Sequence, residues 1–341
     1  METILTGIRV NEEPTLGNFL GAYLPMIQQA KQHAGKYNIN MFIPDLHSFT
    51  TPINHATFYE QIIKGVKYYM AAGLDTENPH IYVYRQSRVP AHAELAWILD
   101  CFTYFGEAAR MIQFKEKSLE NKENVTVGLF NYPILMAADI LLYDAKYVPL
   151  GEDQFQHLEL CRDIALRFNK KFKQEVFTLP ASEQEQVRFM GLERALRIRS
   201  LTDPTKKMSK SDANQKAKIS LSDDPAAAKQ KIMAAKTDSL GLIKYDIFNQ
   251  AGLANLMTIE AALSGLSLQD VVSRWSGEHS YGEFKQKVAD TVAGFLTDFQ
   301  AKVAAISDDE VEAVLERGEA FARQKSQQKL ELVQQVLGLR P

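Results

Sequence analysis

The feature that most constrains the fold of this chain is an alternation of short β-branched segments with longer segments of helical pattern. Residues 3–8, 41–43 and 81–84 are predicted strands. An amphipathic helix is predicted to open at Pro14, and a second one covers about 58–72. Strands separated by helix-length segments indicate βαβ units and a parallel sheet. In such a sheet, ligands bind beyond the carboxyl ends of the strands.

The second part of the chain has a different pattern. After a predicted helix at 226–235, almost every segment from residue 246 onward has helical periodicity. With 341 residues, the chain is long enough for two domains. We therefore predict an α/β domain over residues 1–218 and a helical region over residues 219–341, whose last helix can pack back on the first domain.

Charge and cysteine usage narrow the function classes. The formal charge of −3 gives no overall attraction to nucleic acid, so any RNA contact requires local basic surface. Cys101 and Cys161 lie in apolar helical patterns without metal-ligand spacing, which predicts buried free thiols in a reducing compartment. The sequence shows no signal-peptide pattern and no apolar run near the roughly 18 residues of a membrane span. We therefore predict a cytoplasmic protein without a membrane partner.

Residues 205–212, Thr-Lys-Lys-Met-Ser-Lys-Ser-Asp, form a lysine-rich segment with no helix or strand period. This pattern predicts a mobile, cationic surface loop. Lys207 and Lys210 are suited to a polyanion whose charge grows during a reaction, such as a triphosphate that loses pyrophosphate. The alternative is a solvated lysine-rich turn without function.

Two further segments carry candidate ligand contacts. The helix that opens at residues 14–18 follows a strand, and Gly17 would allow phosphate to approach its backbone N–H groups; an ordinary capped helix is the alternative. A predicted strand at 147–150 turns into a helix through Gly-Glu-Asp-Gln at 151–154. Glu152 and Asp153 are common surface residues at a helix start, but at a strand end they could hold a ribose hydroxyl.

Asp139 is a carboxylate on an otherwise apolar helical stripe that includes Tyr132, Met136 and Tyr143. The helix is predicted to begin at Pro133. A buried carboxylate is costly unless a donor reaches it. The donor is either a group within the fold or the N–H of a ligand whose apolar body packs on Met136.

With these motifs in view, the chain resembles a known family. Residues 207–211, Lys-Met-Ser-Lys-Ser, resemble the KMSKS loop of class I aminoacyl-tRNA synthetases, and residues 15–18, Thr-Leu-Gly-Asn, resemble the HIGH motif in its tryptophanyl form. The pattern of the bacterial tryptophanyl-tRNA synthetases is also similar to the strings at 89–93, 113–117, 132–143, 148–154 and 203–206. The likeness runs from about residue 3 to the C-terminal helix.

This resemblance implies a Rossmann-like catalytic domain over 1–218, with the loop at 205–212, and a helical region over 219–341 that binds the tRNA anticodon. L-tryptophan would react with ATP and Mg²⁺ to give tryptophanyl-adenylate and pyrophosphate. Tryptophan would then pass to the 2′-hydroxyl of the terminal adenosine of tRNA(Trp). Mg²⁺ would be bound through the ATP phosphates, without a metal site on the protein. A homodimer is typical of the family, and an apolar surface around the helix at 97–105 would suit it; no DNA partner is implied.

The resemblance also implies roles for individual residues. Catalysis would rest on Lys117, Lys207, Lys210 and Asn18. ATP would be bound by Arg9, Val10, Asn11, Gly17, Asn18, Gly151, Glu152, Asp153, Ile198, Lys207, Met208, Ser209, Lys210 and Ser211. Tryptophan would be bound by Leu5, His47, Tyr132, Met136, Asp139, Val148 and Gln154, with Asp139 as acceptor of the indole N–H.

Three places depart from the family pattern. Residues 9–12, Arg-Val-Asn-Glu, replace the usual Gln-Pro-Ser-Gly, Leu5 stands where a phenylalanine commonly packs on the indole, and Pro44 replaces an aliphatic residue. Arg9 would strengthen phosphate binding and Glu12 would weaken it. We predict that the combined substitution Arg9→Gln and Glu12→Gly changes the Michaelis constant for ATP, and an unchanged constant would refute this.

Three other functions are compatible with parts of the sequence. A tyrosyl-tRNA synthetase shares the core, but Met-Ala-Ala-Asp at 136–139 and the short helical C-terminus disfavour it. A small-molecule nucleotidylyltransferase is disfavoured by the KMSKS string and the helical region. A non-catalytic relative that binds tryptophan or tRNA is supported only by residues 9–12, and the intact Lys207, Lys210 and Asp139 argue against it.

Overall fold

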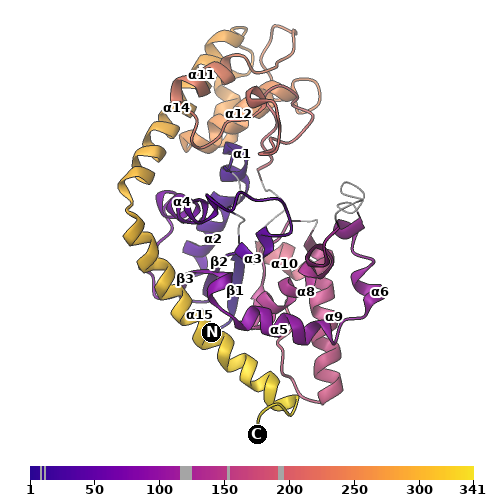
Figure 1. Cartoon of the computed structure of the whole chain (residues 1–341). Helices are drawn as coiled ribbons and strands as arrows, with labels where there is room; N and C mark the ends of the chain where they lie inside the picture. The colour runs from indigo at the N-terminus through magenta and orange to yellow at the C-terminus, as the bar shows by residue number, and fades with distance from the viewer. Residues whose placement is uncertain (8–9, 11–12, 116–124, 152–153, 191–195) are drawn as a thin grey trace.

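The computed structural model describes residues 1–7, 10, 13–115, 125–151, 154–190 and 196–341 (Figure 1). Its centre is a parallel sheet of β1 (Thr3–Gly7), β2 (Asn38–Ile43), β3 (Ile81–Arg85) and β4 (Ala145–Tyr147). The strand order is β3-β2-β1-β4. The predicted parallel sheet of βαβ units is therefore confirmed, because helices connect each strand to the next.

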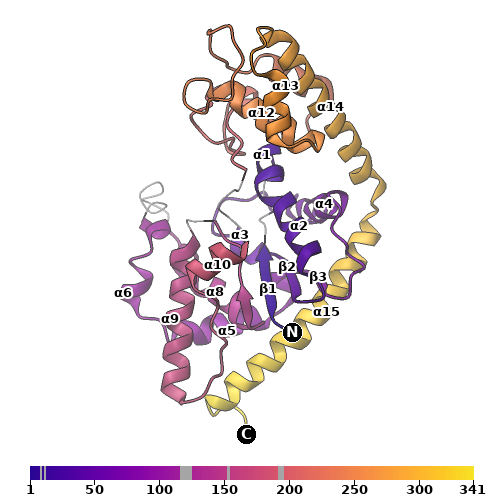
Figure 2. The ribbon, with the colours of Figure 1, turned by 180° about the vertical axis from the view of Figure 1, so that it is seen from behind.

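Helices cover the sheet and make up almost all of the regular structure after it (Figure 2). In chain order they are α1 (Leu16–Asn18), the π-helix η1 (Phe19–Tyr23), α2 (Leu24–His33), α3 (Asp45–Ser48), α4 (Phe58–Ala71), the 3-10 helix η2 (Gln86–Arg88), α5 (Ala91–Asp100), α6 (Phe105–Ala108), α8 (Val127–Leu141), α9 (Phe155–Phe172), α10 (Glu183–Met190), the 3-10 helix η5 (Gln215–Ala217), α11 (Pro225–Met233), α12 (Ala251–Ser264), α13 (Leu268–Trp275), α14 (Tyr281–Ala305) and α15 (Asp308–Val336).

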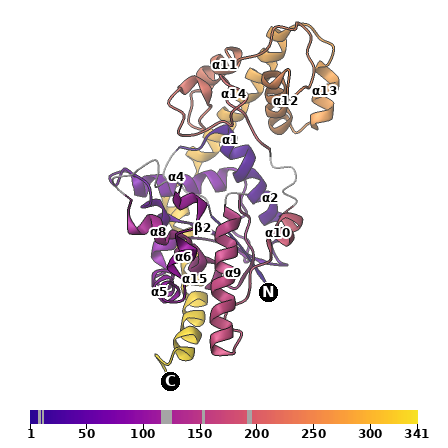
Figure 3. The ribbon, with the colours of Figure 1, turned by 90° about the vertical axis from the view of Figure 1, so that its right-hand side faces the viewer.

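Helices α11–α14 gather at one end of the molecule, beyond α1, and α15 runs back along the sheet (Figures 1 and 3). The π-helix joins the two parts, since the ring of Phe19 lies 5.1 Å from that of Phe295 and 5.2 Å from that of Phe299. Helix α15 then packs tightly on β3: a Cβ added at Gly318 would lie 1.9 Å from the backbone oxygen of Val83. In the described ranges, no helix is both long enough and apolar enough to span a bilayer.

Several boundaries differ from the sequence prediction. Helix α8 begins at Val127, not at Pro133, because the Thr126 hydroxyl accepts a hydrogen bond from Leu129 N at 3.2 Å and caps an earlier turn. Pro133 therefore lies inside the helix. Strand β4 is Ala145–Tyr147 and not 147–150, since the N–H of Val148 donates to the Gln186 side chain at 3.0 Å.

Two other predictions are corrected within the described part of the chain. The sequence also predicts a short strand at 195–201, before the lysine loop; in the described part of that segment it is reduced to one antiparallel bridge between Arg199 and Lys207. Cys161 is a buried free thiol as predicted, but Cys101 is exposed. Cys101 follows the last residue of α5, so the apolar pattern extends past the point where the helix faces the core. The same boundary separates α5 from α6, so residues 97–105 are not one helix.

Candidate functional site

A pocket of about 370 Å³ lies at the carboxyl ends of β1 and β2. It is lined by all seven residues predicted to bind tryptophan: Leu5, His47, Tyr132, Met136, Asp139, Val148 and Gln154. They come from β1, α3, α8 and the segments around the start of α9. This position agrees with the general placement of ligands in parallel α/β sheets.

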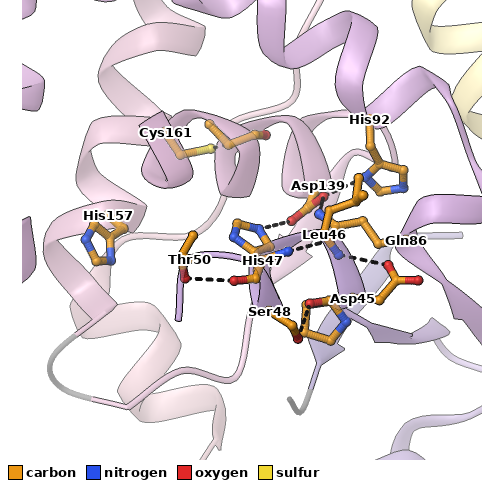
Figure 4. Close-up of polar contacts among 12 residues, drawn as sticks. Asp45, Leu46, His47, Ser48, Thr50, Gln86, His92, Asp139, His157 and Cys161 are labelled. Carbon is orange, nitrogen blue, oxygen red and sulfur yellow. Dashed lines mark hydrogen bonds and ion pairs between the residues drawn. The ribbon is translucent and has the colours of Figure 1, made fainter. Parts of the chain in front are cut away.

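Asp139 is the buried polar group of this pocket and is only 1% exposed. Its Oδ2 atom lies 2.9 Å from His47 Nε2, and its Oδ1 atom lies 2.6 Å from His92 Nδ1 (Figure 4). Gln86 Nε2 donates to Oδ1 at 2.7 Å. Burial by itself raises the pKa of Asp139, but the hydrogen bonds from His47 and His92 outweigh it and hold the pKa below its ordinary value. The carboxylate is therefore kept as an acceptor.

The local folding of three segments brings these donors to Asp139. His47 lies on α3, directly after β2, and its N–H donates to Gln86 Oε1 at 3.4 Å. Gln86 follows the last residue of β3, and His92 lies in the first turn of α5. Asp45 ties the first two segments together, since its carboxylate accepts from Ser87 N at 2.8 Å and from the Ser87 hydroxyl. Burial raises the pKa of Asp45 despite these bonds.

A second set of polar contacts involves two further lining residues of the pocket, Tyr132 and Gln154. The Tyr132 hydroxyl lies 3.1 Å from His157 Nε2, and His157 Nδ1 lies 3.0 Å from Gln154 Oε1. His157 is buried, so it fixes both neighbours in place. Tyr132 and Gln154 thus present polar groups to the same cavity that Leu5 and Met136 line with apolar ones.

Sequence reasoning missed Gln86, His92 and His157 as site residues. For Gln86 the sequence does contain a signal, since it is a polar residue two positions after the strand predicted at 81–84. The sequence pattern identifies His92 and His157 only as parts of helices, and their role at the site follows from their contacts in the structure. Gln113 also lines the pocket and had no assigned role.

The predicted phosphate corner lies where α1 meets the chain after the lysine loop. Leu16 N donates to Ile219 O at 2.8 Å. A Cβ added at Gly17 would lie 3.2 Å from the Cβ of Met208 and 3.6 Å from that of Ile198. Three residues predicted to bind ATP are therefore in one place, and a side chain at residue 17 would press on Met208. Thr15 is the N-cap of α1, and Asn18 completes a capping box with it: the Asn18 Oδ1 atom accepts from the N–H and the hydroxyl of Thr15, both at 3.0 Å.

The lysine loop, residues 205–212, is held at both ends. Met208 is 3% exposed and its N–H donates to Ile198 O at 2.9 Å. Lys218 Nζ donates to the backbone oxygens of Lys210 at 2.5 Å and of Asp212 at 2.9 Å. Lys207, directly before Met208, is exposed, and the side chain of Lys210 is half-buried. The Ser209 and Ser211 hydroxyls lie 3.0 Å apart.

The remaining predicted ATP and catalytic residues are only partly described. Arg9, Asn11, Lys117, Glu152 and Asp153, together with Glu12 of the departing turn, lie outside the described residues. Val10 is buried, with its side chain against Gly65 of α4, so that side chain is not available to a ligand. Gly151 is exposed at the turn before α9.

Comparison with known proteins defines the class of the chain. A family model described as "tRNA synthetases class I (W and Y)" matches residues 3–297. The chain therefore belongs to the class I aminoacyl-tRNA synthetases of the tryptophan and tyrosine type. The Rossmann-like α/β fold with a mostly helical C-terminal region, predicted from the sequence, is that of this family.

Within that class, several of the similar proteins are named as tryptophan enzymes. A tryptophan–tRNA ligase of Caldanaerobacter subterraneus subsp. tengcongensis is 43% identical over 339 residues, which cover 99% of both chains. The crystal structure of tryptophanyl-tRNA synthetase from Mycoplasma pneumoniae is 33% identical with a TM-score of 0.81, covering 100% of this chain and 98% of that one. That from Campylobacter jejuni, complexed with ADP and tryptophan, is 28% identical with a TM-score of 0.80 and covers 98% and 99%.

Proposed function

We propose that this chain is a tryptophan–tRNA ligase. It activates L-tryptophan with ATP and then transfers the tryptophanyl group to the 2′-hydroxyl of the terminal adenosine of tRNA(Trp). The observation that carries this proposal is the pocket in which Asp139 and six other predicted tryptophan contacts meet. The names of the similar proteins support the same activity.

The proposed pocket selects tryptophan by one hydrogen bond and by shape. A carboxylate offers about four lone-pair sites, and three donors of the fold use part of them on Asp139. The indole N–H takes a remaining site, while Met136, Leu5 and Val148 pack on the ring. The side chain of phenylalanine has no hydrogen-bond donor, and the hydroxyl of tyrosine lies at a different position from the indole nitrogen. Either amino acid would therefore leave Asp139 without a hydrogen bond from the ligand. Tyr132 and Gln154 receive the α-amino group.

In the proposed first step, a tryptophan carboxylate oxygen attacks the α-phosphorus of ATP. The bond from that phosphorus to the bridging oxygen breaks, and pyrophosphate leaves with the electron pair. Lys207 and Lys210 lie in the loop packed against Gly17, so they can neutralise the charge that grows on pyrophosphate. Lys117 and Asn18 complete the catalytic set, and the other predicted ATP contacts hold the adenosine. No protein nucleophile is needed, because positioning and electrostatics lower the barrier.

Mg²⁺ supplies charge neutralisation on the ATP phosphates when bound. We propose that the phosphates supply most of its ligands, as Mg²⁺ prefers. The described ranges hold no group of three or more His, Cys, Asp or Glu side chains that could bind a metal ion.

The domain division, the partners and the location are also proposals. Residues 1–218 would form the catalytic domain and residues 219–341 the region that reads the tRNA anticodon, and the cytoplasm is the compartment in which this activity is needed.

A homodimer is supported by an apolar groove of about 330 Å³ lined by Phe49, Ala96, Trp97 and Leu135. Trp97 is 70% exposed at its rim, and the exposed Phe105 lies on the nearby α6. Trp97→Glu should give a monomer in light scattering, whereas an unchanged mass would refute this interface.

ATP–pyrophosphate exchange tests the proposed function, with tryptophan, tyrosine and phenylalanine assayed in parallel. Exchange with tryptophan alone is expected. Exchange with tyrosine instead would agree with a class I aminoacyl-tRNA synthetase but would overturn the proposed specificity for tryptophan. Silence with all three amino acids, from protein that still binds tryptophan, would show a non-catalytic relative.

A further inference from the structure

A second cavity lies at the opposite end of the sheet from the tryptophan pocket. It has a volume of about 470 Å³ and is formed by the starts of β1 and β2, the segment after α8 and one face of α15. The residues that matter here are Thr3, Asn38, Asn40, Tyr143, Lys146 and Lys325. Among the described residues, none lines both cavities. We call this the rear cavity.

Asn40 is the most deeply buried of the polar residues that line the rear cavity in the described ranges. It lies on β2, opposite Leu5 of β1 and Tyr82 of β3, and is only 1% exposed. Within the described part of the chain, neither its amide nitrogen nor its amide oxygen has a hydrogen bond of normal geometry, and its polar neighbour is the buried Tyr84 hydroxyl. A buried amide that has no such bond on either atom is costly. This position therefore points to an additional group that both donates and accepts.

Positive charge lies beside this amide. Lys146 and Lys325 line the cavity, and within the described ranges neither ammonium group has an ion pair. Lys329, by contrast, is occupied: its Nζ lies 2.8 Å from the Asp144 carboxylate and donates to Val176 O at 2.7 Å. Glu2 is the other acidic lining residue and is exposed. The two unpaired lysines leave the cavity suited to an anion.

We propose that the rear cavity binds a small organic anion that carries an amide edge. The amide edge pairs with Asn40, donor to acceptor and acceptor to donor. The carboxylate or phosphate of the same molecule lies between Lys146 and Lys325. Two kinds of molecule have this chemistry: an open-chain amido acid, and a pyrimidine nucleoside monophosphate whose base presents the same edge.

A polar chain connects the rear cavity with the tryptophan pocket. Tyr143 lines the rear cavity, and its hydroxyl lies 2.8 Å from His92 Nε2. The other ring nitrogen of His92 contacts Asp139. The buried Tyr84 hydroxyl interacts electrostatically with Tyr143 and Asn40 but has no hydrogen bond of normal geometry. A ligand that engages Asn40 therefore changes the polar surroundings of Tyr143, and through His92 the acceptor strength of Asp139. This coupling, unlike the binding itself, rests on the proposed function.

Methyl NMR of the full chain, labelled at the methionine methyl groups, can test both statements. Met1 lines the rear cavity and Met136 lines the tryptophan pocket, so their signals report the two sites separately. The probes are succinamate and uridine 5′-monophosphate, and butyrate and butyramide are controls that each carry one end of succinamate. At least one probe should shift the Met1 signal saturably, with a dissociation constant on the order of 1 mM. Which probe binds distinguishes an amido acid from a nucleotide.

Variants decide whether the site is the one proposed. Asn40→Leu removes an amide that has no hydrogen bond of normal geometry, so it should fold normally and abolish binding. Lys325 is an exposed residue of α15, and Lys325→Gln should weaken binding about five-fold. Lys302→Gln, at an exposed residue of α14, is the control and should not weaken binding. No saturable Met1 shift with either probe would mean that the cavity holds water only and would overturn the proposal. Binding that survives Asn40→Leu, or equal binding of butyrate, would overturn it as well.

The coupling has its own readout. With the bound probe, the dissociation constant of tryptophan should change about two-fold or more, and Tyr143→Phe should reduce that change without affecting probe binding. An unchanged dissociation constant for tryptophan would overturn the coupling but would not contradict the proposed binding site in the rear cavity. Failure of pyrophosphate exchange would overturn the proposed function and leave the Met1 result intact, so the two failures can be told apart.

Discussion

His92 and Asp139 form a buried contact of 2.6 Å between Nδ1 and Oδ1 at the base of the tryptophan pocket. His92 is fully buried, and its second ring nitrogen contacts the Tyr143 hydroxyl. His92 therefore does not itself line the tryptophan pocket in the described structure. It acts as a positioning residue that orients the carboxylate.

Asp139→Asn tests the specificity carboxylate directly. The amide presents one acceptor where the carboxylate had two, and it must still satisfy His47, Gln86 and His92. The ratio kcat/KM for tryptophan-dependent exchange should fall about 100-fold or more. Asp163→Asn on the exposed face of α9 is the matched control and should behave as the parent chain. A variant that kept both activity and discrimination would contradict the role of Asp139.

His92→Phe tests the positioning role. Asp139 would keep two donors, and Tyr143 would lose its contact with His92, so the free energy of unfolding should fall by about 2 kcal/mol. The Michaelis constant for tryptophan should rise more than kcat falls, because His92 orients Asp139 and touches no reacting atom. His92→Gln can still donate and should restore part of the tryptophan affinity. A merely structural role would lower the melting temperature and leave both constants unchanged.

Gly17→Ala tests the corner between α1 and the lysine loop. Its Cβ would lie 3.2 Å from the Cβ of Met208, so the loop that carries Lys207 and Lys210 must shift. The Michaelis constant for ATP should rise about ten-fold, whereas tryptophan affinity should not change, since the tryptophan pocket has other lining residues. Gly294→Ala in α14 is a matched control with nothing within 4 Å of the new Cβ. That change should stabilise the helix by about 0.5–1 kcal/mol.

The pKa of Asp139 predicts a difference at low pH. A carboxyl group whose pKa is lowered by folding stabilises the fold above its unfolded pKa and loses that contribution as the pH falls through the folded pKa. Because the pKa of Asp139 is lowered, stability should decline as the pH drops below about 4. Asp139→Asn lacks the group and should decline less steeply. Urea denaturation of both chains at several pH values measures this, and equal slopes would count against it.

Most of the tryptophan pocket could be predicted because the chain resembles a known family over nearly its whole length. Local pattern adds to this for two residues, since Met136 and Asp139 share the face of one helix. Helix α13 lies in the part of the chain predicted to be helical from residue 246 onward, where its Ser267 cap and apolar positions are local signals. The start predicted for helix α8, at Pro133, was wrong. Proline is a strong local signal for a helix start, and the Thr126 cap, which marks the true start, is a weaker one.

The sequence by itself determined which segments become strands and helices and which motifs carry the chemistry, because periodicity, caps and short strings are local properties of the chain. Only the tertiary structure decided which side chains reach Asp139. Gln86 and His92 are separated from it by 53 and 47 residues, and no local pattern marks either as its partner. The same holds for the rear cavity, where Asn40 of β2 faces lysines from the segment after α8 and from α15. These contacts depend on how the helices pack on the sheet, and that packing is decided by burial of apolar faces across the whole chain.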